Sequence, residues 1–121
     1  MKKILIVDDE LEIRKLVNST LNSSDYQILQ AESGQKAIEI ARAENPDLII
    51  MDIMMPGGID GFEATRILKD DPETKGSTII ILSAKGQEED LEGGLKAGAD
   101  DYFPKPFSPL ALVRKVEEVL G

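Results

Sequence analysis

The chain has 121 residues and a formal net charge of −9, and it contains neither cysteine nor histidine. These absences exclude disulfides, thiolate chemistry and the usual zinc ligands, so any metal must be bound by oxygen, which favours Mg²⁺, Mn²⁺ or Ca²⁺. The negative charge opposes direct nucleic acid binding, because such binding depends on neutralising phosphates with Lys and Arg.

The length and hydropathy of the chain indicate one cytoplasmic domain. A chain of this length can bury most of the apolar surface that it exposes when unfolded. No apolar run is long enough to span a bilayer, and the N-terminal residues 1–3 lead directly into a short expected strand. We therefore expect a single domain over residues 1–121 that makes no contact with a membrane.

Apolar runs alternate five times with segments of helical periodicity. The expected strands lie at 4–7, 26–30, 48–51, 79–82 and near 102–103. The first three expected helices each carry an apolar face. In the first helix it is made by Leu11 or Ile13 with Leu16, Val17 and Leu21. The second helix starts near Ser33 and presents Ala37, Ile40 and Ala41, and the third follows Asp60-Gly61 and presents Ala64, Ile67 and Leu68. The alternation predicts an α/β fold, in which helices cover both faces of a parallel sheet.

The last two expected helices differ in the strength of their signal. The fifth has Ser108 as its N-cap and Pro109 at its first position, and its apolar residues repeat with helical spacing at Leu112, Val113, Val116 and Leu120. The fourth contains glycines that weaken a helix and few apolar anchors, namely Gly86, Gly93, Gly94, Leu91 and Leu95. It is expected to be either a short helix or a segment marginal enough to shift.

The composition of the strands predicts their order in the sheet. The runs at 4–7, 48–51 and 79–82 are unbroken aliphatic segments, as expected of strands covered on both faces, whereas the other two are mixed and suit the edges. The order 2-1-3-4-5 of a doubly wound, flavodoxin-like sheet satisfies this pattern. It places the first and third strands side by side and makes their crevice the topological switch point.

Polar residues lie just past four of the expected strands. They are Asp8-Asp9-Glu10, Asp52, Ser83 and Lys105. Because the carboxyl ends of parallel strands share one edge of a sheet, these side chains should converge. Carboxylates in one cleft repel each other unless a cation neutralises them. Asp9 and Asp52 are therefore expected to bind Mg²⁺ directly, with a carbonyl just after Asp52 as a third ligand and Asp8 acting through a water.

Most of these residues have a simpler explanation when taken alone. The acids at 8–10 could cap a helix and supply its first-turn charges, Ser83 could cap the following helix, and Lys105 could be a surface lysine in a proline-rich turn. Asp52 is harder to explain in this way, because a charge at the end of a buried strand needs a partner. Lys105 supplies one, especially if the Lys105–Pro106 bond is cis.

Four separated motifs resemble the receiver domain of two-component response regulators, the CheY-like family. They are Val7-Asp8-Asp9-Glu10, Asp52 to Pro56 with Asp60-Gly61 after it, Leu82-Ser83-Ala84, and Gly98 to Phe107 with its Lys105-Pro106-Phe107 end. The resemblance covers essentially the whole chain in the right order. One departure is the loop Gly57-Gly58-Ile59, which is one residue longer than the usual pattern and leaves the geometry before the third helix open.

The resemblance implies a role for each matching residue. Asp52 would accept a phosphoryl group from the phosphohistidine of a sensor histidine kinase or a histidine phosphotransfer protein. The metal ligands for Mg²⁺, or Mn²⁺, would be Asp8, Asp9, Asp52 and the backbone carbonyl of Met54. The phosphoryl group would be bound by Ser83, Ala84 and Lys105, the switch residues would be Ser83 and Tyr102, and Met54 and Lys85 would tune the lifetime of the acyl phosphate.

The resemblance also implies the partners. Phosphorylation would reshape the face made by the fourth helix, the fifth strand and the fifth helix, which would then control a downstream protein target, and a homodimer after phosphorylation is compatible with this. The domain would promote its own phosphotransfer and dephosphorylation without being an enzyme in the usual sense. With no effector domain after the last helix, we expect a stand-alone switch, and a fragment of a longer regulator is left open.

Three other functions are weighed against this one. A Mg²⁺-dependent phosphatase with an aspartyl-phosphate intermediate would need Asp-x-Asp on one loop and a cap insertion, and the sequence shows neither. A flavin or nucleotide binder would present small residues in its first loop, whereas Asp8-Asp9-Glu10 would repel a phosphate. A phosphorylation-independent scaffold receiver would not need the acceptor residues, all of which are present.

Overall fold

A computed structural model describes residues 1–22, 25–53, 55, 58–83, 88–105 and 108–120, without the side chains of residues 83 and 88–91. Five parallel strands form one sheet in the order β2-β1-β3-β4-β5. The strands are β1 (Lys2–Val7), β2 (Tyr26–Ala31), β3 (Leu48–Asp52), β4 (Thr78–Ser83) and β5 (Asp101–Pro104). Both the order and the assignment of the mixed strands to the edges are confirmed.

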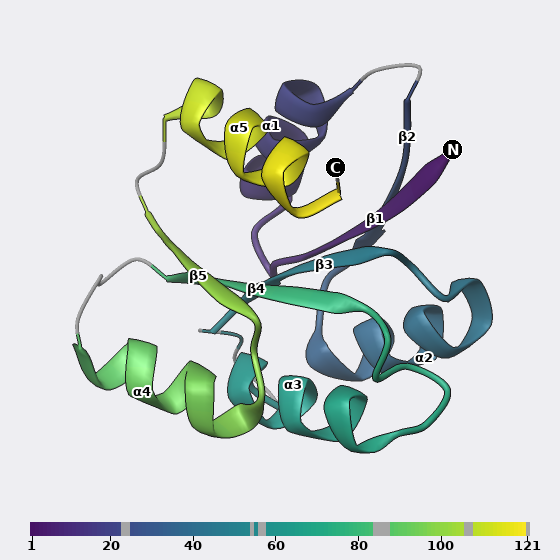
Figure 1. The fold of residues 1–121 in the computed structure, drawn as a ribbon, viewed down its shortest axis with the longest axis vertical. Helices are drawn as coiled ribbons and strands as arrows, with labels where there is room; N and C mark the ends of the chain where they lie inside the picture. The colour runs from purple at the N-terminus through teal and green to yellow at the C-terminus, as the bar shows by residue number, and fades with distance from the viewer. Residues whose placement is uncertain (23–24, 54, 56–57, 84–87, 106–107, 121) are drawn as a thin grey trace.

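Five helices cover the two faces of the sheet. They are α1 (Leu11–Leu21), α2 (Gly34–Glu44), α3 (Gly61–Asp70), α4 (Glu88–Ala97) and α5 (Pro109–Leu120). As Figure 1 shows, α1 and α5 lie on one face of the sheet, and α2, α3 and α4 lie on the other. The predicted doubly wound α/β fold is therefore confirmed.

The sheet separates two hydrophobic cores, because successive side chains of a strand point to opposite faces. On the side of α2, α3 and α4 the core contains Leu5, Ile49, Met51, Ile79 and Ile81. On the side of α1 and α5 the alternate residues of the same strands are buried, together with Val17, Leu21, Leu112 and Val116. Burial on both faces explains why the central strands are aliphatic throughout.

Three of the four predicted helix starts have the expected caps. The hydroxyl of Ser33 accepts a hydrogen bond from the Lys36 amide at 3.1 Å, and the carboxylate of Asp60 accepts one from the Glu63 amide at 2.8 Å. The Ser108 hydroxyl accepts from the Ala111 amide at 3.4 Å. The start of α1 differs, since its N-cap residue Glu10 makes no side-chain cap hydrogen bond. The Glu10 side chain therefore does not cap α1, although the Asp8 carboxylate accepts a hydrogen bond from the Glu10 amide.

Two predicted apolar faces are partly wrong. Val17 and Leu21 of α1 are buried, but Leu11 is 51% exposed and Leu16 is 46% exposed. The buried stripe runs through Ile13, Val17 and Leu21 at intervals of four residues, and each residue turns the helix by about 100°, so neither Leu11 nor Leu16 falls on that stripe.

The prediction that Leu95 anchors α4 in the core is wrong as well, because this side chain is 60% exposed. The helix meets its neighbours through glycine instead. A Cβ on Gly93 would lie 2.8 Å from the Phe62 ring, and one on Gly94 would lie 3.3 Å from the Ile81 side chain. The other expected residues, Gly86 and the side chain of Leu91, lie outside the described part of the chain.

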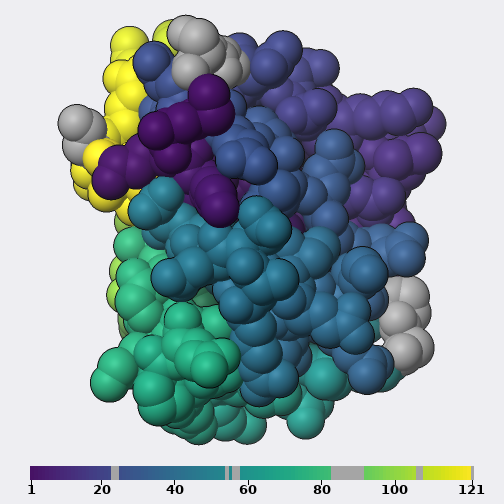
Figure 2. Space-filling view, turned by 90° about the vertical axis from the view of Figure 1, so that its right-hand side faces the viewer, coloured from purple at the N-terminus to yellow at the C-terminus, as the bar shows by residue number. Residues whose placement is uncertain are grey.

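The first residues of β1 and the C-terminal helix α5 lie close together at the surface (Figure 2). The space-filling view shows the purple N-terminal residues on the surface, close to the yellow C-terminal helix (Figure 2). The Lys3 amide and carbonyl both bond to Asp47, at 2.8 Å and 2.9 Å, and hold the start of β1 against the turn before β3. The loops that carry the polar residues lie at the opposite, carboxyl edge of the sheet.

Candidate functional site

Three of the predicted site residues meet at the carboxyl edge of the sheet. Asp8 follows β1, Asp52 ends β3, and Lys105 follows β5. The Lys105 Nζ atom lies 2.9 Å from Asp8 Oδ2 and 3.1 Å from Asp52 Oδ1. One ammonium group therefore links two carboxylates that come from separate strands.

The burial of these groups makes their charges important. Asp8 is 1% exposed and Asp52 is 4% exposed, while Lys105 is only partly exposed. Removing a charge from water is costly unless it is paired and hydrogen-bonded. Lys105 pairs with both carboxylates, but it supplies one positive charge against two negative ones. The cluster retains a net negative charge that a further cation can neutralise.

This imbalance appears in the pKa of Asp52. Burial and the charge of Asp8 raise the pKa of Asp52 from 3.8 to about 6, against the opposing effect of Lys105. At pH values above this the carboxyl group of Asp52 is mostly ionised. Burial alone would lower the pKa of Lys105, but the hydrogen bonds and charges of Asp8 and Asp52 outweigh burial and raise that pKa.

Asp8 is held at each of its polar groups. Its amide donates to the Ala31 carbonyl at 3.1 Å, and its Oδ1 atom accepts from the Glu10 amide at 2.9 Å. Its backbone carbonyl accepts from Arg14 Nη1 at 2.6 Å. With Lys105 on Oδ2, no described group of Asp8 is free to turn. Arg14 was not identified from the sequence. The one signal for this contact is the position of Arg14, one helical turn after Glu10.

Asp9 and Glu10 differ from Asp8 in being exposed. In the described part of the chain, their carboxylates accept no hydrogen bond and make no ion pair. One ligand oxygen from each of Asp8, Asp9 and Glu10 can be chosen so that all lie within 4.8 Å of one another. The charge of Asp9 also contributes to the raised pKa of Asp52. A set of donors made only of carboxylate oxygens fits a hard divalent cation such as Mg²⁺.

The loop after β3 packs closely around Asp52. The Gly61 amide donates to the Ile53 carbonyl at 3.1 Å, and a Cβ at Gly61 would overlap the carbonyl oxygen of Asp52. Similarly, a Cβ on Gly34 would lie 2.8 Å from the Ile59 carbonyl oxygen. Ile59 of this loop therefore lies against the start of α2. Gly57 lies outside the described residues.

Several predicted contacts lie outside what the structure describes. These are the Met54 carbonyl, the Ala84 amide, Lys85, the Lys105–Pro106 bond and the hydroxyl of Ser83. The backbone of Ser83 is the last residue of β4 and pairs with Pro104 of β5, which places it at the same edge as Asp52. The roles predicted for these groups remain predictions.

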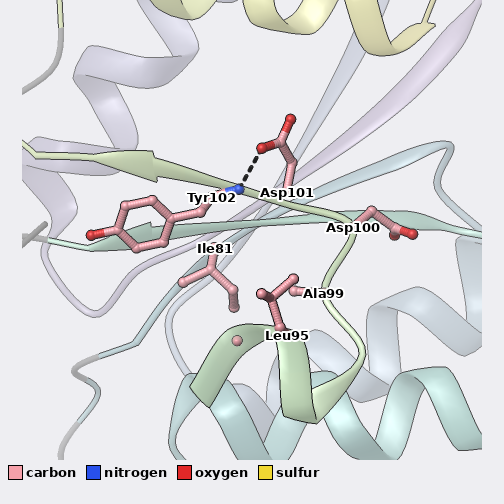
Figure 3. Close-up of a pocket in the computed structure, with 7 residues that line it drawn as sticks. Ile81, Leu95, Ala99, Asp100, Asp101 and Tyr102 are labelled. Atoms are coloured by element: carbon pink, nitrogen blue, oxygen red, sulfur yellow. Dashed lines mark hydrogen bonds between the residues drawn. The ribbon is translucent and has the colours of Figure 1, made fainter. Parts of the chain in front are cut away.

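Tyr102, the predicted switch residue, lies on β5 and packs against the core under α2, α3 and α4. Its hydroxyl is buried and has no hydrogen-bond partner among the described residues. Beside it lies an apolar cavity of about 90 Å³ whose lining includes Ile81, Gly94, Leu95 and Ala99. Figure 3 shows the Tyr102 ring extending away from Leu95 and Ala99. The cavity leaves space beside the Tyr102 ring, and the switch role of this residue stays a prediction.

A model of the response regulator receiver domain matches residues 4–117. The chain belongs to this family. The receiver domain is 46% identical over 119 residues to the phosphate regulon transcriptional regulatory protein PhoB of Pseudomonas aeruginosa, covering 98% of this chain and 52% of that protein. It is 41% identical over 121 residues to protein PilH of the same organism, covering 100% of this chain and 99% of PilH. The receiver domain therefore spans about half the length of PhoB and nearly all of PilH.

Solved structures support the same assignment. The chemotaxis protein CheY4 of Vibrio cholerae superimposes with a TM-score of 0.91 at 32% identity, covering 98% of each chain. The BeF₃-activated receiver domain of DrrB gives a TM-score of 0.88 at 30% identity, covering 99% of this chain and 97% of that one. The protein is thus a receiver domain of a two-component response regulator. Within the ranges that the structure describes, no helix combines the length and apolar character needed to cross a membrane.

Proposed function

We propose that this receiver domain is a phosphorylation switch in which Asp52 accepts a phosphoryl group. The observation that carries the proposal is the buried carboxylate of Asp52, which shares the Lys105 ammonium with Asp8 at 3.1 Å and 2.9 Å. Its pKa of about 6 leaves it ionised at neutral pH yet incompletely neutralised. A buried, charged and under-neutralised nucleophile beside open carboxylates suits phosphoryl transfer assisted by a cation.

The donor in this proposal is the phosphohistidine of a sensor histidine kinase or a histidine phosphotransfer protein. None of the 121 residues is a histidine, so the donor histidine lies outside this sequence. An oxygen of Asp52 attacks the phosphorus and forms an acyl phosphate. The P–N bond breaks, and the imidazole leaves with the electron pair and takes up a proton from water.

Asp8, Asp9 and Asp52 would hold Mg²⁺, or Mn²⁺, together with the Met54 carbonyl, and Glu10 lies close enough to assist. When bound, the cation neutralises charge on the transferring phosphoryl oxygens. Lys105 would move its hydrogen bond from Asp52 to a phosphoryl oxygen. The Ser83 hydroxyl and the Ala84 amide would donate to the same group.

The output of the switch would be the face formed by α4, β5 and α5. A phosphoryl group adds about −1.5 to −2 charge and three strong acceptors, which would draw Ser83 inward and allow Tyr102 to change its packing. Three features support a rearrangement here: the Tyr102 hydroxyl has no hydrogen-bond partner among the described residues, a cavity lies beside it, and α4 meets its neighbours through glycine. The changed face would bind a downstream protein target or a second copy of the domain, and hydrolysis of the acyl phosphate would reset it.

The rival functions are not favoured. A phosphorylation-independent scaffold receiver would not need the buried pairing of Asp52 with Lys105 and Asp8. A receiver family match over residues 4–117 leaves no room for the cap insertion that a phosphatase of this chemistry needs. We therefore propose a switch that modifies itself rather than an enzyme with steady turnover.

The test is to incubate the protein with Mg²⁺ and a small acyl phosphate or phosphoramidate, and then to measure its intact mass. The expected result is the addition of one phosphoryl group. No phosphoryl group should be added when a chelator removes Mg²⁺ beforehand, or when Asp52→Asn replaces the wild type. Asp70→Asn makes the same chemical change at an exposed site on α3 and should be phosphorylated normally. An unmodified wild-type mass, or a phosphoryl group that survives Asp52→Asn, would refute the proposal.

A further inference from the structure

Arg14 connects the ends of two neighbouring strands from its place in α1. Its Nη1 atom donates to the backbone carbonyl of Asp8 at 2.6 Å, and its Nε atom donates to Gln30 Oε1 at 3.2 Å. Asp8 follows β1, and Gln30 belongs to β2, which pairs with β1. The guanidinium thus bridges the carboxyl ends of β1 and β2, directly behind the acidic loop.

Several hydrogen bonds hold Asp8, but none of the described ones holds the side chain of Asp9 or Glu10. The N-cap residue Glu10 makes no side-chain cap hydrogen bond, so α1 does not begin on the usual anchor. The Asp8 carboxylate holds the Glu10 amide at 2.9 Å. Among the described residues, no hydrogen bond or ion pair holds the Asp9 carboxylate. The direction of the Asp9 side chain is therefore set by the backbone that carries it.

Arg14 restrains the part of the backbone that matters for Asp9. Because a peptide group is planar, holding the Asp8 carbonyl also holds the Asp9 amide nitrogen. The Asp9 side chain can then move only through its own backbone and side-chain torsions. A guanidinium suits this task, since charge-assisted hydrogen bonds are strong and its rigid fork can serve two acceptors at once.

We propose that Arg14 is a positioning residue for the metal site, which directs the Asp9 carboxylate toward the cation by fixing the peptide group between Asp8 and Asp9. This inference rests on the proposed Mg²⁺ binding. Arg14 acts through the backbone, since its described hydrogen bonds go to a carbonyl and an amide oxygen and none goes to a carboxylate. Residues that orient metal ligands without touching the metal commonly affect affinity by 10- to 100-fold.

The first measurement is the Mg²⁺ dissociation constant of the intact chain, by titration calorimetry without any phosphodonor. Arg14→Gln should raise it by about tenfold. Lys15→Gln makes the same charge change on an exposed residue of the same helix and should alter it by less than about twofold, because exposed charges are screened by salt. Arg14→Lys should remain close to Arg14→Gln, since an ammonium cannot reproduce the fork. Gln30→Leu removes only one acceptor and should raise the constant by about threefold.

The second measurement is the amide exchange rate of Glu10 in metal-free protein, by NMR. Arg14→Gln should speed this exchange more than that of core amides, whereas Lys15→Gln should not. The inference is overturned by wild-type Mg²⁺ affinity in Arg14→Gln, by equal losses in both glutamine variants, or by full recovery in Arg14→Lys. If the wild type binds no Mg²⁺, the proposed function fails, and the metal-free exchange rates still decide whether Arg14 fixes the loop. Should Arg14→Gln fail to fold, Gln30→Leu decides by the same two readouts.

Discussion

Replacing Asp52 with asparagine should stabilise the metal-free protein at neutral pH. The substitution keeps the size of the side chain and removes one of two carboxylate charges that are buried around a single ammonium. Asp8 keeps its ion pair with Lys105, so the variant contains one buried charge of each sign. The removal of a repulsive charge should outweigh the loss of one hydrogen bond.

The size of the effect follows from the pKa of Asp52. Its ordinary value of 3.8 rises to about 6 in the folded protein, so folding favours the protonated form. Below pH 3.8 Asp52 is protonated in both the folded and the unfolded protein, and its charge does not reduce the stability of the fold. This part of the stability is lost as the pH rises from 3.8 through 6. By linkage, ionisation of Asp52 costs about 1.5 kcal/mol at pH 5 and about 3 kcal/mol at pH 7.5. The advantage of Asp52→Asn should therefore grow by about 1.5 kcal/mol between these two pH values.

Urea unfolding followed by circular dichroism, with a chelator present, measures this difference directly. Wild type, Asp52→Asn and the exposed-site control Asp70→Asn should be compared at pH 5 and pH 7.5. The control should show no pH-dependent gain, since Asp70 is exposed. An advantage of equal size at both pH values, or an Asp52→Asn variant less stable than wild type at pH 7.5, would show that the Asp52 charge is not strained in the folded state.

Two further substitutions test the packing and charge of the site. Lys105→Met leaves Asp8 and Asp52 without their shared cation, so the free energy of unfolding in urea should fall by about 3 kcal/mol at pH 7.5. The loss should be smaller at pH 5, where Asp52 is mostly protonated. Unchanged stability would contradict the pairing. Gly61→Ala should cost at least about 2 kcal/mol and slow phosphorylation, because its methyl group would overlap the Asp52 carbonyl. Gly76→Ala meets no atom within 4 Å and should be neutral or slightly stabilising, so similar losses in both glycine variants would count against the close contact.

The fold could be predicted from the sequence because its signals are local. Strand ends, caps such as Ser33 and Asp60, and the aliphatic central strands each indicate an element without reference to the rest of the chain. The meeting of Asp8, Asp52 and Lys105 could also be predicted, because parallel strands bring their carboxyl ends to a common edge.

The remaining features depend on tertiary contacts that a single sequence does not encode in a readable pattern. Leu11, Leu16 and Leu95 are apolar at helical positions, yet they are exposed because neighbouring elements cover only one stripe of each helix. The hydrogen bond from Arg14 to the Asp8 carbonyl depends on the path of a long side chain and on a backbone acceptor. No sequence pattern specifies either one.

The pairing of Lys105 with Asp8 joins residues that are 97 positions apart, and the lysine follows the last strand of the sheet. During synthesis, β1 and β3 emerge long before that lysine, so their two aspartates must wait without a counter-charge. A partly made chain would hold two repelling carboxylates at the carboxyl edge of an unfinished sheet, which disfavours early closure of this edge. The carboxylates of Asp8 and Asp52 thus gain their shared counter-charge only after all five strands of the sheet have been made.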